Sequence, residues 1–449
     1  MKAFHAYDIR GIYNQDFNKD DVYKIGFWIP GLLKAKKVLV GRDCRVSSPE
    51  ILSFLCKGIT DSGADVYDAG LTTTPMIYFT TASQGFEASV MITASHNGKE
   101  YNGLKVSRKN ALPVGYDTGL GEIEKLMKTE KIVPANQKGS VIKIDAKSPY
   151  LEFLKKYVPD ISQLKMSIDC SNGMAALLIR EILGNSPQYL FEELDGTFPN
   201  HSPNPLVMDN VKQLQDAVNK NKSDIGIIFD GDADRVMFVD ERGKFIPPDL
   251  MIALMAEYFL KDKKNPRVLH DIRTSRSVSE HIVELGGEPN IWKVGRAFAA
   301  LKLREIDGIF GGELAGHYYF KDFFYSDSGI LACLIILKIY SEYRIKGISL
   351  SEIIAKIVKY HNSGEINFTI ERKLEAMEKL KNHFSKTETP LKILDFDGYR
   401  IEFNEWWFNI RPSNTEPYLR LLVEANSEHL LKDKIEAIKC QLEEFFITN

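Results

Sequence analysis

Short apolar runs alternate with amphipathic segments along the first three quarters of the chain. In the first part, apolar runs at residues 37–40, 64–67 and 88–92 predict buried strands, and residues 49–60 predict a helix with Pro49 in its first turn. Strands that alternate with helices are typical of an α/β layer with parallel pairing. We therefore expect the chain to begin with an α/β domain.

The same alternation continues and then changes near residue 365. Further strands are expected at residues 101–106, 166–169, 225–229, 268–271 and 290–294, and helices at 121–131, 174–183, 275–285 and 328–344. The last part combines helices at 373–384 and 428–446 with strands at 406–410 and 418–424 and a hairpin turn at Asp397-Gly398. The expected fold is three mixed α/β domains of similar topology, at 1–146, 147–245 and 246–364, plus a smaller C-terminal α+β domain at 365–449, around one central cleft.

Composition narrows the function classes. A net charge of −3 over 449 residues argues against general nucleic-acid binding, because no basic excess exists to neutralise phosphates. The five cysteines are scattered without a C-x-x-C pair, which predicts reduced thiols and no structural zinc. Residues 1–10 lack the apolar core of a signal peptide, and the longest apolar run, 331–337, is too short to cross a bilayer. We expect a cytoplasmic protein, a monomer or weak dimer, without a membrane partner.

The serine of Thr93-Ala94-Ser95-His96-Asn97 follows directly on the predicted strand 88–92. Serine is a poor nucleophile alone and needs a base or a metal near its hydroxyl. The turn and strand at 101–106 could return Lys105 to this hydroxyl like the second arm of a hairpin. A solvated lysine is the competing interpretation.

The run Asp230-Gly231-Asp232-Ala233-Asp234-Arg235 follows the predicted strand 225–229. Three carboxylates at alternate positions repel one another unless a cation lies among them, and oxygen-only ligands favour Mg²⁺. An EF-hand is disfavoured although Glu241 falls at its last ligand position, because Arg235 stands where glycine is required and a strand precedes the run. A phosphatase that uses Asp230 as nucleophile, or a purely structural acidic loop, would also fit this run of residues.

Several loops carry groups suited to phosphate or sugar. Cations follow the strands of the third domain, where α/β sheets bind ligands: Arg273, Arg276, Lys293 and Arg296. In the loop at 311–317, Glu313 and His317 suit vicinal sugar hydroxyls, although a capping or hairpin loop would use the same residues. Residues 411–417 unite an arginine with hydroxyl, amide and backbone donors, which predicts an anion cradle. The unpatterned stretch 198–205 is a candidate functional loop.

Five motifs in order resemble the α-D-phosphohexomutase superfamily, most closely its phosphomannomutase/phosphoglucomutase branch. They are Tyr-Asp-Ile-Arg-Gly at 7–11, Thr-Ala-Ser-His-Asn at 93–97, Asp-Gly-Asp-Ala-Asp-Arg at 230–235, Gly-Glu-Leu-Ala-Gly-His at 312–317 and Arg-Pro-Ser-Asn-Thr-Glu-Pro at 411–417. Neither a P-loop nor a dinucleotide-binding glycine motif occurs in the sequence. The resemblance covers the whole chain.

The resemblance implies a phosphoserine at Ser95 and a Mg²⁺ held by Ser95, Asp230, Asp232 and Asp234. Ser95 would pass its phosphoryl group to a hexose monophosphate, and the resulting 1,6-bisphosphate would turn over and return the other phosphoryl group. Glucose or mannose 1,6-bisphosphate would be the activator. Arg10, His96 and Lys105 would serve proton transfer and charge stabilisation; Lys105 needs a lowered pKa to act as a base, which Arg10 could provide. The implied substrate contacts are Tyr7, Arg235, Arg273, Arg296, Glu313, Leu314, Ala315, Gly316, His317, Arg411, Pro412, Ser413, Asn414 and Thr415.

Three positions concern which sugar the protein prefers. Ala315 stands where the family usually has serine, and Arg296 where many phosphomannomutases have histidine, so both bear on sugar preference. Leu314 replaces the glutamine typical of glucosamine mutases and argues against that branch. The competing hypotheses are the Asp230 phosphatase, which leaves the remaining loops unexplained, and a catalytically silent sugar-phosphate sensor, against which the intact Ser95 and aspartates argue.

Overall fold

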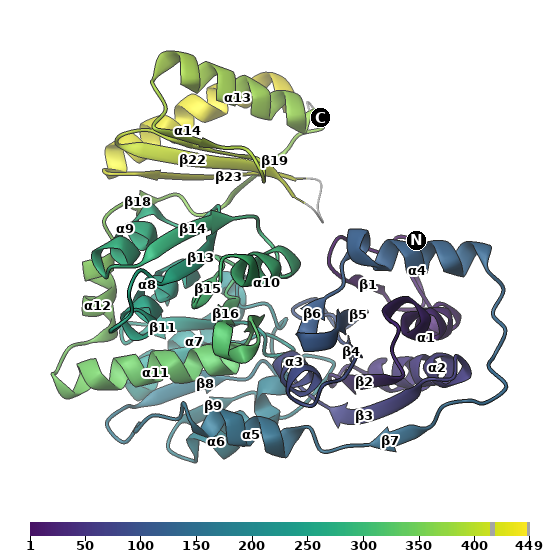
Figure 1. The fold of residues 1–449 in the computed structure, drawn as a ribbon. Helices are drawn as coiled ribbons and strands as arrows, with labels where there is room; N and C mark the ends of the chain where they lie inside the picture. Colours follow the sequence, from purple (N-terminus) through teal and green to yellow (C-terminus); the bar gives the residue numbers. More distant parts are fainter. Residues whose placement is uncertain (414–417, 447–449) are drawn as a thin grey trace.

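Four β-sheets follow one another along the chain, each with its own helices (Figure 1). The structure is a computed structural model, and it describes residues 1–413 and 418–446. We call the four sheets with their helices units 1 to 4. The predicted fold class, three mixed α/β layers and a final α+β layer, is confirmed. No helix within the described residues combines the length and apolar character needed to cross a membrane.

Unit 1 contains a seven-stranded sheet in the order β1-β5-β4-β2-β3-β7, with β6 on β5. Its central strands β2, β3 and β4 are parallel, whereas β5 returns antiparallel to β4. The sheet is therefore mixed, and the expected hairpin-like return of β5 is confirmed. The elements are β1 (Ile9–Ile12), α1 (Lys19–Leu33), β2 (Lys37–Arg42), α2 (Ser48–Asp61), β3 (Asp65–Leu71), α3 (Thr74–Ser83), β4 (Ala88–Ile92), β5 (Tyr101–Arg108), β6 (Leu112–Pro113), α4 (Leu120–Thr129) and β7 (Val141–Lys143).

Unit 2 has the sheet order β12-β11-β10-β8-β9, with β8, β9 and β10 parallel. The helix expected at 174–183 is instead a 3₁₀ turn, Met174–Leu177, followed by a short α-helix. Its start is held by the hydrogen bond from Met174 N–H to the Gly231 carbonyl. The elements are α5 (Lys147–Lys155), β8 (Met166–Asp169), α6 (Ile179–Leu183), β9 (Gln188–Leu190), α7 (Met208–Asn221), β10 (Ile225–Phe229), β11 (Val236–Asp240) and β12 (Phe245–Ile246).

Unit 3 repeats the parallel core of unit 2 with the order β14-β13-β15-β16-β17. Unit 4 is an antiparallel sheet in the order β18-β23-β22-β21-β20, with β19 on β23. The elements of unit 3 are α8 (Pro248–Phe259), β13 (Arg267–Asp271), α9 (Arg276–Glu284), β14 (Glu288–Trp292), α10 (Arg296–Glu305), β15 (Phe310–Gly312), β16 (Tyr318–Phe320), β17 (Ser326–Asp327), α11 (Gly329–Ile345) and α12 (Leu350–Ile357). Those of unit 4 are β18 (His361–Asn362), β19 (Ile366–Thr369), α13 (Lys373–Thr387), β20 (Lys392–Leu394), β21 (Tyr399–Glu402), β22 (Trp406–Pro412), β23 (Tyr418–Ala425) and α14 (Glu428–Leu442).

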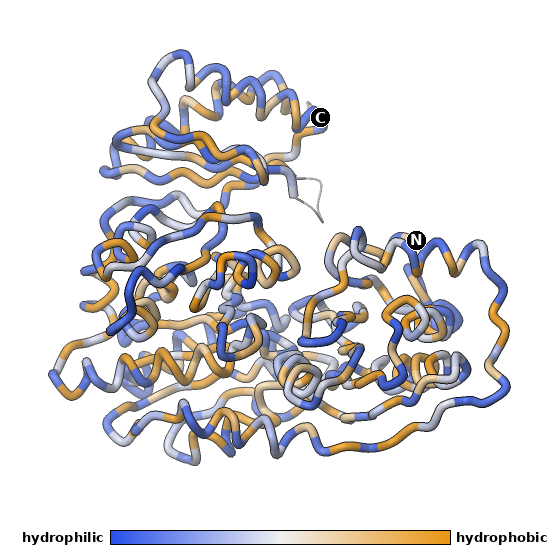
Figure 2. The backbone as a smooth tube through the Cα atoms, in the orientation of Figure 1, coloured by the Kyte–Doolittle hydropathy of each residue, from blue (hydrophilic) through white to orange (hydrophobic). Residues whose placement is uncertain are grey.

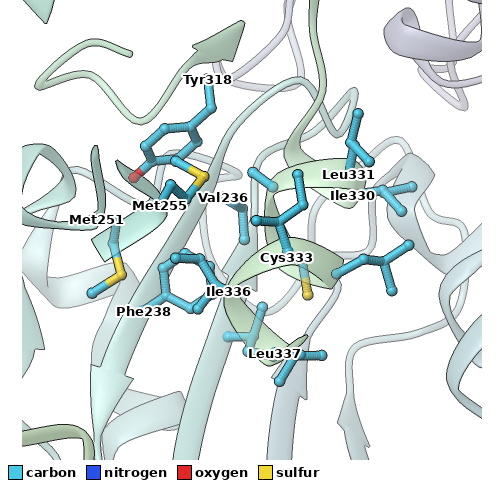
Figure 3. Packing of buried hydrophobic residues seen from close by; sticks show 14 of the residues in the cluster. Val236, Phe238, Met251, Met255, Tyr318, Ile330, Leu331, Cys333, Ile336 and Leu337 are labelled. Atoms are coloured by element: carbon cyan, nitrogen blue, oxygen red, sulfur yellow. The ribbon is translucent and has the colours of Figure 1, made fainter. Parts of the chain in front are cut away.

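Units 2 and 3 share one hydrophobic core. Figure 3 shows residues of β11, such as Phe238, packed between Met251 and Met255 of α8 and the side chains of α11. Helix α3 of unit 1 adds Met76 and Phe79 to this shared core. Units 1 and 4 also have cores of their own. Hydrophobic and hydrophilic residues alternate along α13, as a helix with one buried face requires, whereas most of α11 is buried (Figure 2).

Candidate active site

The candidate loops of units 1 to 3 follow the carboxyl ends of parallel strands, whereas the loop at 411–417 joins two antiparallel strands of unit 4. Ser95 follows β4, Asp230 follows β10, and Arg273 and Glu313 follow β13 and β15. Ligands of open α/β sheets bind at these strand ends. Contacts between units show that the loops meet, because Ser95 bonds Asp230 and His317 lies beside Asp234.

Ser95 lies at the boundary between units 1 and 2. Its hydroxyl donates a hydrogen bond to Asp230 Oδ2 at 2.9 Å, and His96 Nδ1 lies 3.3 Å from the same Oγ. The residue is buried and has a φ of 51°, a left-handed backbone that L-residues apart from Asn and Asp seldom adopt. The surrounding contacts therefore hold Ser95 in a strained conformation that directs its hydroxyl at the acidic loop.

Asp230, Asp232 and Asp234 form a fully buried cluster. Ligand oxygens of the three carboxylates lie within 4.8 Å of one another. The Oδ1 atoms of Asp232 and Asp234 are buried and accept no hydrogen bond from any described residue. Burial, followed by the charges of Asp234 and Asp232, raises the pKa of Asp230 well above its ordinary value. Buried oxygens without donors fit an oxygen-ligated divalent cation such as Mg²⁺.

The EF-hand hypothesis does not fit the structure. Strands β10 and β11 flank the acidic loop and pair antiparallel with each other, where an EF-hand has helices. Glu241, the residue at the last EF-hand ligand position, accepts a hydrogen bond from Ser351 at 2.5 Å instead.

Lys105 reaches the acidic cluster but not the serine hydroxyl. It lies opposite Met91 in the β4–β5 pairing, and its Nζ donates at 2.6 Å to both Asp232 Oδ2 and Asp234 Oδ2. Burial alone would lower the pKa of Lys105, but the two carboxylates outweigh burial and raise it above the ordinary value. Arg10 lowers the pKa of Lys105, as expected, but its effect is smaller than that of the two carboxylates, so Lys105 lacks the lowered pKa that a base would need.

Arg10 contacts the serine loop, residues 93–101, which includes His96. Arg10 donates to Asn97 Oδ1 at 2.8 Å and forms an ion pair with Asp8. Burial and the charge of Arg235, with smaller contributions from further nearby cations, lower the pKa of His96 far below its ordinary value. His96 therefore carries a neutral imidazole at neutral pH, which can accept a proton.

The loop after β15 carries Glu313 and His317, and His317 Nδ1 lies 3.7 Å from Asp234 Oδ1 of the acidic loop. Glu313 accepts hydrogen bonds from Tyr319 Oη at 2.6 Å and from Gly295 N at 3.2 Å. His317 Nδ1 lies 2.7 Å from Asp327 Oδ2, which leaves the Nε2 atom of its ring for a ligand. His317 also pairs with Arg235 through an isolated backbone bridge. Burial raises the pKa of Glu313.

Arg296 shares the carboxylate of Asp327 with His317. Its Nε donates to Asp327 Oδ1 at 2.9 Å, and its guanidinium carbon lies 3.7 Å from the centre of the Tyr78 ring on α3. Asp327 and Tyr78 were not predicted as site residues. No sequence pattern identifies Tyr78, because only the docking of α3 brings it to Arg296.

In the remaining part of the loop at 311–317, the contacts are made by backbone atoms. Leu314 N–H donates to Asp271 Oδ2 at 2.8 Å, and Ala315 is partly buried. Gly316 has a φ of 82° and donates to the Glu313 carbonyl. A turn with a left-handed position explains the glycine.

Arg273 and Arg411 bring two buried guanidinium groups together between units 3 and 4. Arg273 forms an ion pair with Asp271 at 2.7 Å. Burial and the charge of Arg273 lower the pKa of Arg411, whose buried Nε finds no acceptor among the described residues. Two cations held this close favour an anion between them. Pro412 ends β22 and Ser413 N–H donates to the Tyr418 carbonyl, while Asn414 and Thr415 lie outside the described residues.

Not every predicted cation faces the site. Arg276 instead donates to the backbone carbonyls of Phe403 and Asn404 in unit 4, so its expected place among the phosphate-binding cations is wrong. Lys293 lies over the Phe298 ring, 5.5 Å from its centre. Tyr7 connects unit 1 to unit 3 through a 3.3 Å hydrogen bond from its hydroxyl to the Val294 carbonyl.

Four family models match the chain in order. They are described as phosphoglucomutase/phosphomannomutase, alpha/beta/alpha domains I, II and III, at residues 1–133, 148–243 and 247–360, and the C-terminal domain at 365–439. The chain belongs to the phosphoglucomutase/phosphomannomutase family. Family membership confirms the resemblance drawn from the five motifs. The chain is therefore an isomerase that moves a phosphoryl group within hexose phosphates, and the phosphatase and sensor hypotheses are not favoured.

Relatives of known name match nearly the whole chain. A phosphomannomutase of Methanocaldococcus jannaschii is 37% identical over 98% of this chain and 97% of that protein. A phosphomannomutase of Escherichia coli strain K12 is 35% identical over 95% of this chain and 96% of that protein. The crystal structure of a family protein from Burkholderia thailandensis is 28% identical, covers 99% of this chain and 97% of that one, and has a TM-score of 0.89.

Proposed function

We propose that this mutase interconverts the 6-phosphate and 1-phosphate of mannose or glucose with Ser95 as the phosphoryl carrier. The proposal rests chiefly on the hydrogen bond of 2.9 Å between Ser95 Oγ and Asp230, because the hydroxyl then lies beside three buried carboxylates. Two of them, Asp232 and Asp234, have an oxygen that accepts no hydrogen bond from the described residues. Mg²⁺ would be held by Asp230, Asp232, Asp234 and the phosphate of Ser95. It would neutralise charge on the transferring phosphoryl group.

The transfer step needs a nearby group that accepts and donates one proton. The bond between phosphorus and Ser95 Oγ breaks as a bond to the free sugar hydroxyl forms, and the proton of that hydroxyl is finally returned to Ser95 Oγ. His96 is neutral and lies 3.3 Å from Oγ, so it can accept the proton of the sugar hydroxyl and pass it on to Oγ. Arg10, which bonds the Asn97 side chain, and Lys105, which bonds Asp232 and Asp234, stabilise charge near the transferring phosphoryl group.

The remaining loops hold the sugar. Glu313 and the free Nε2 of His317 bind sugar hydroxyls. The phosphate that is not transferred lies between Arg273 and Arg411, whose mutual repulsion it relieves. The further contacts that we propose are Tyr7, Arg235, Arg296, Leu314, Ala315, Gly316, Pro412, Ser413, Asn414 and Thr415. The 1,6-bisphosphate formed in the first transfer reorients and returns its second phosphoryl group to Ser95.

Several finer assignments belong to the same proposal. Glucose or mannose 1,6-bisphosphate is the activator, because it can phosphorylate Ser95. The domains are residues 1–146, 147–245, 246–364 and 365–449, and these boundaries fall between the segments that the four family models match. The protein acts in the cytoplasm as a monomer or weak dimer, without nucleic-acid or membrane partners; a net charge of −3 supports the absence of nucleic acid.

Intact-mass measurement tests this function. Purified wild type and Ser95→Ala are compared before and after addition of glucose 1,6-bisphosphate. We expect one phosphate adduct on the wild type and none on the variant, together with conversion of mannose 1-phosphate or glucose 1-phosphate that depends on the bisphosphate. Absence of both would refute the proposal, and net phosphate release that depends on Asp230 would favour the phosphatase. Turnover of the two sugar 1-phosphates then decides the preference.

A further inference from the structure

We propose that Arg45 is a positioning residue that holds Ser95 in its phosphoryl-accepting conformation. Arg45 lies between β2 and α2 in unit 1, and none of the five sequence motifs includes it. The proposal rests on the proposed role of Ser95 as phosphoryl carrier. It assigns to Arg45 no contact with the substrate or with the reacting atoms.

The guanidinium group of Arg45 is buried and fully bonded. Its residue exposure is 1%, although arginine is among the residues least often buried. Every nitrogen of the group has a partner, and four of the five acceptors are backbone carbonyls of the serine loop, residues 93–101. Nε bonds Asp43 Oδ2 at 3.0 Å, Nη1 bonds the carbonyls of Gly98 and Tyr101 at 2.6 and 3.1 Å, and Nη2 bonds those of Ser95 and Asn97 at 2.8 and 2.7 Å.

The bond to Ser95 bears on the direction of the reactive hydroxyl. Ser95 has a φ of 51°, and a residue that is not glycine keeps such a backbone only where its surroundings enforce it. Arg45 donates a hydrogen bond to the Ser95 carbonyl. The acidic loop lies close to the same oxygen, since a Cβ added at Gly231 would lie 2.5 Å from it. The Ser95 peptide is therefore held by Arg45 and packed against the acidic loop.

Unit 2 covers Arg45 with the long loop between β9 and α7. The Phe198 ring lies over the guanidinium group, with its centre 4.9 Å from Cζ. A Cβ added at Gly196 would lie 2.4 Å from Arg45 Cα, so the two backbones are in direct contact. This loop includes the unpatterned stretch 198–205, and packing over Arg45 gives that stretch a structural role. The loop and Arg45 together join the serine loop to unit 2.

A lysine at position 45 cannot make the five hydrogen bonds of Arg45. Arginine offers five N–H donors in a rigid planar fork, whereas lysine offers three donors on one nitrogen. R45K retains the charge and most of the stem but leaves carbonyls of the serine loop without donors. We expect kcat to fall by about tenfold to a hundredfold because Ser95 is misplaced. KM should change by no more than about threefold, because the residues that bind the sugar are unchanged.

The experiment compares steady-state kinetics, phosphate labelling by intact mass and Tm for wild type, S95A, R45K and R400K. Arg400 is the matched control, because it is 1% exposed and donates at 2.9 and 2.6 Å to the carbonyls of Ile272 and Thr274 rather than to the serine loop. R400K should lower Tm as R45K does, but its kcat should stay within about threefold of wild type. A general cost of replacing a buried arginine would lower kcat equally in both variants and would overturn the inference.

Two outcomes separate this inference from the proposed function. A wild type that glucose 1,6-bisphosphate does not label would overturn the proposed function and this inference with it. If the wild type is labelled and R45K has the same kcat as the wild type, only the role of Arg45 is overturned. If R45K does not fold, D43N decides: it keeps the guanidinium group but removes the charge that orients it, and we expect a fall in kcat at unchanged KM. An unchanged kcat in folded D43N would then overturn the inference.

Discussion

Replacing Asp327 by asparagine tests whether one buried carboxylate holds two of the substrate-binding groups. Asp327 is fully buried, with His317 Nδ1 2.7 Å from Oδ2 and Arg296 Nε 2.9 Å from Oδ1. Burial alone would raise the pKa of Asp327, but Arg296 and the hydrogen bond to His317 outweigh burial and lower the pKa to about 2. The carboxylate is therefore ionised at every pH at which the enzyme would be assayed.

The expected loss follows from these two contacts. Hydrogen bonds to charged groups contribute about 1.5–3 kcal/mol each. In Asp327→Asn the amide oxygen can still accept from Arg296, but the amide nitrogen replaces the oxygen that faces His317. The loss of one charged contact, about 2 kcal/mol, corresponds to a fall of about 30-fold in kcat/KM. Most of the fall should appear in KM, because the proposed contacts of His317 and Arg296 with the sugar form in the ground state as well as in the transition state.

The assay is steady-state turnover of the preferred sugar 1-phosphate at saturating bisphosphate, with Tm measured in parallel. Asp322→Asn is the matched control, because Asp322 is exposed and lies on the same connection between β16 and β17. We expect wild-type kinetics for the control. A kcat/KM of Asp327→Asn within about threefold of wild type, at unchanged Tm, would refute the role of this carboxylate, since that factor corresponds to well under 1 kcal/mol.

Two further predictions concern stability. Burial, with smaller contributions from Glu424 and Asp271, raises the pKa of Asp249 from 3.8 to about 6. Ionisation of Asp249 therefore lowers the folding stability, by nothing below about pH 4 and by about 3 kcal/mol above about pH 6. Between these pH values the Tm of Asp249→Asn should rise relative to that of wild type. A Tm difference that does not change with pH would contradict this prediction. After chelation, Mg²⁺ at a concentration about 100 times its Kd should stabilise wild type by about 2.7 kcal/mol. The rise in Tm should be lost in Asp232→Asn, and an equal rise in both proteins would place the ion elsewhere.

Local patterns predicted the elements that carry the chemistry. The apolar runs before Ser95 and Asp230 are the buried strands β4 and β10, so both loops were placed at strand ends from the sequence alone. The return of Lys105 was predictable because strands that follow one another in the sequence usually pair in the sheet, as β4 and β5 do. The expected helix at 174–183 was wrong, because its start is set by a bond to Gly231 that no local pattern encodes.

Contacts between distant segments were not predictable. Thr74, at the start of α3, donates at 2.5 Å to Asp232 Oδ2, although the two residues are 158 positions apart. Tyr78 of the same helix meets Arg296. Helix α3 is apolar on most faces, which indicates burial but not the unit in which it is buried. Arg45 likewise resembles any charged residue of a turn until the serine loop folds around it.

The location of the shared core has a consequence for turnover. Ser95 and Asp230 belong to different units, yet Phe79 of α3 packs in the core of units 2 and 3, and Thr74 bonds the acidic loop. Their separation is therefore set by close packing, which resists continuous deformation. Unit 4 instead has its own core, and its contacts with unit 3 include hydrogen bonds from Arg400 to backbone carbonyls and the packing of Phe396 on Trp292. The reorientation of the bisphosphate that we propose is thus more easily accommodated by movement at unit 4 than by separation of Ser95 from the acidic loop.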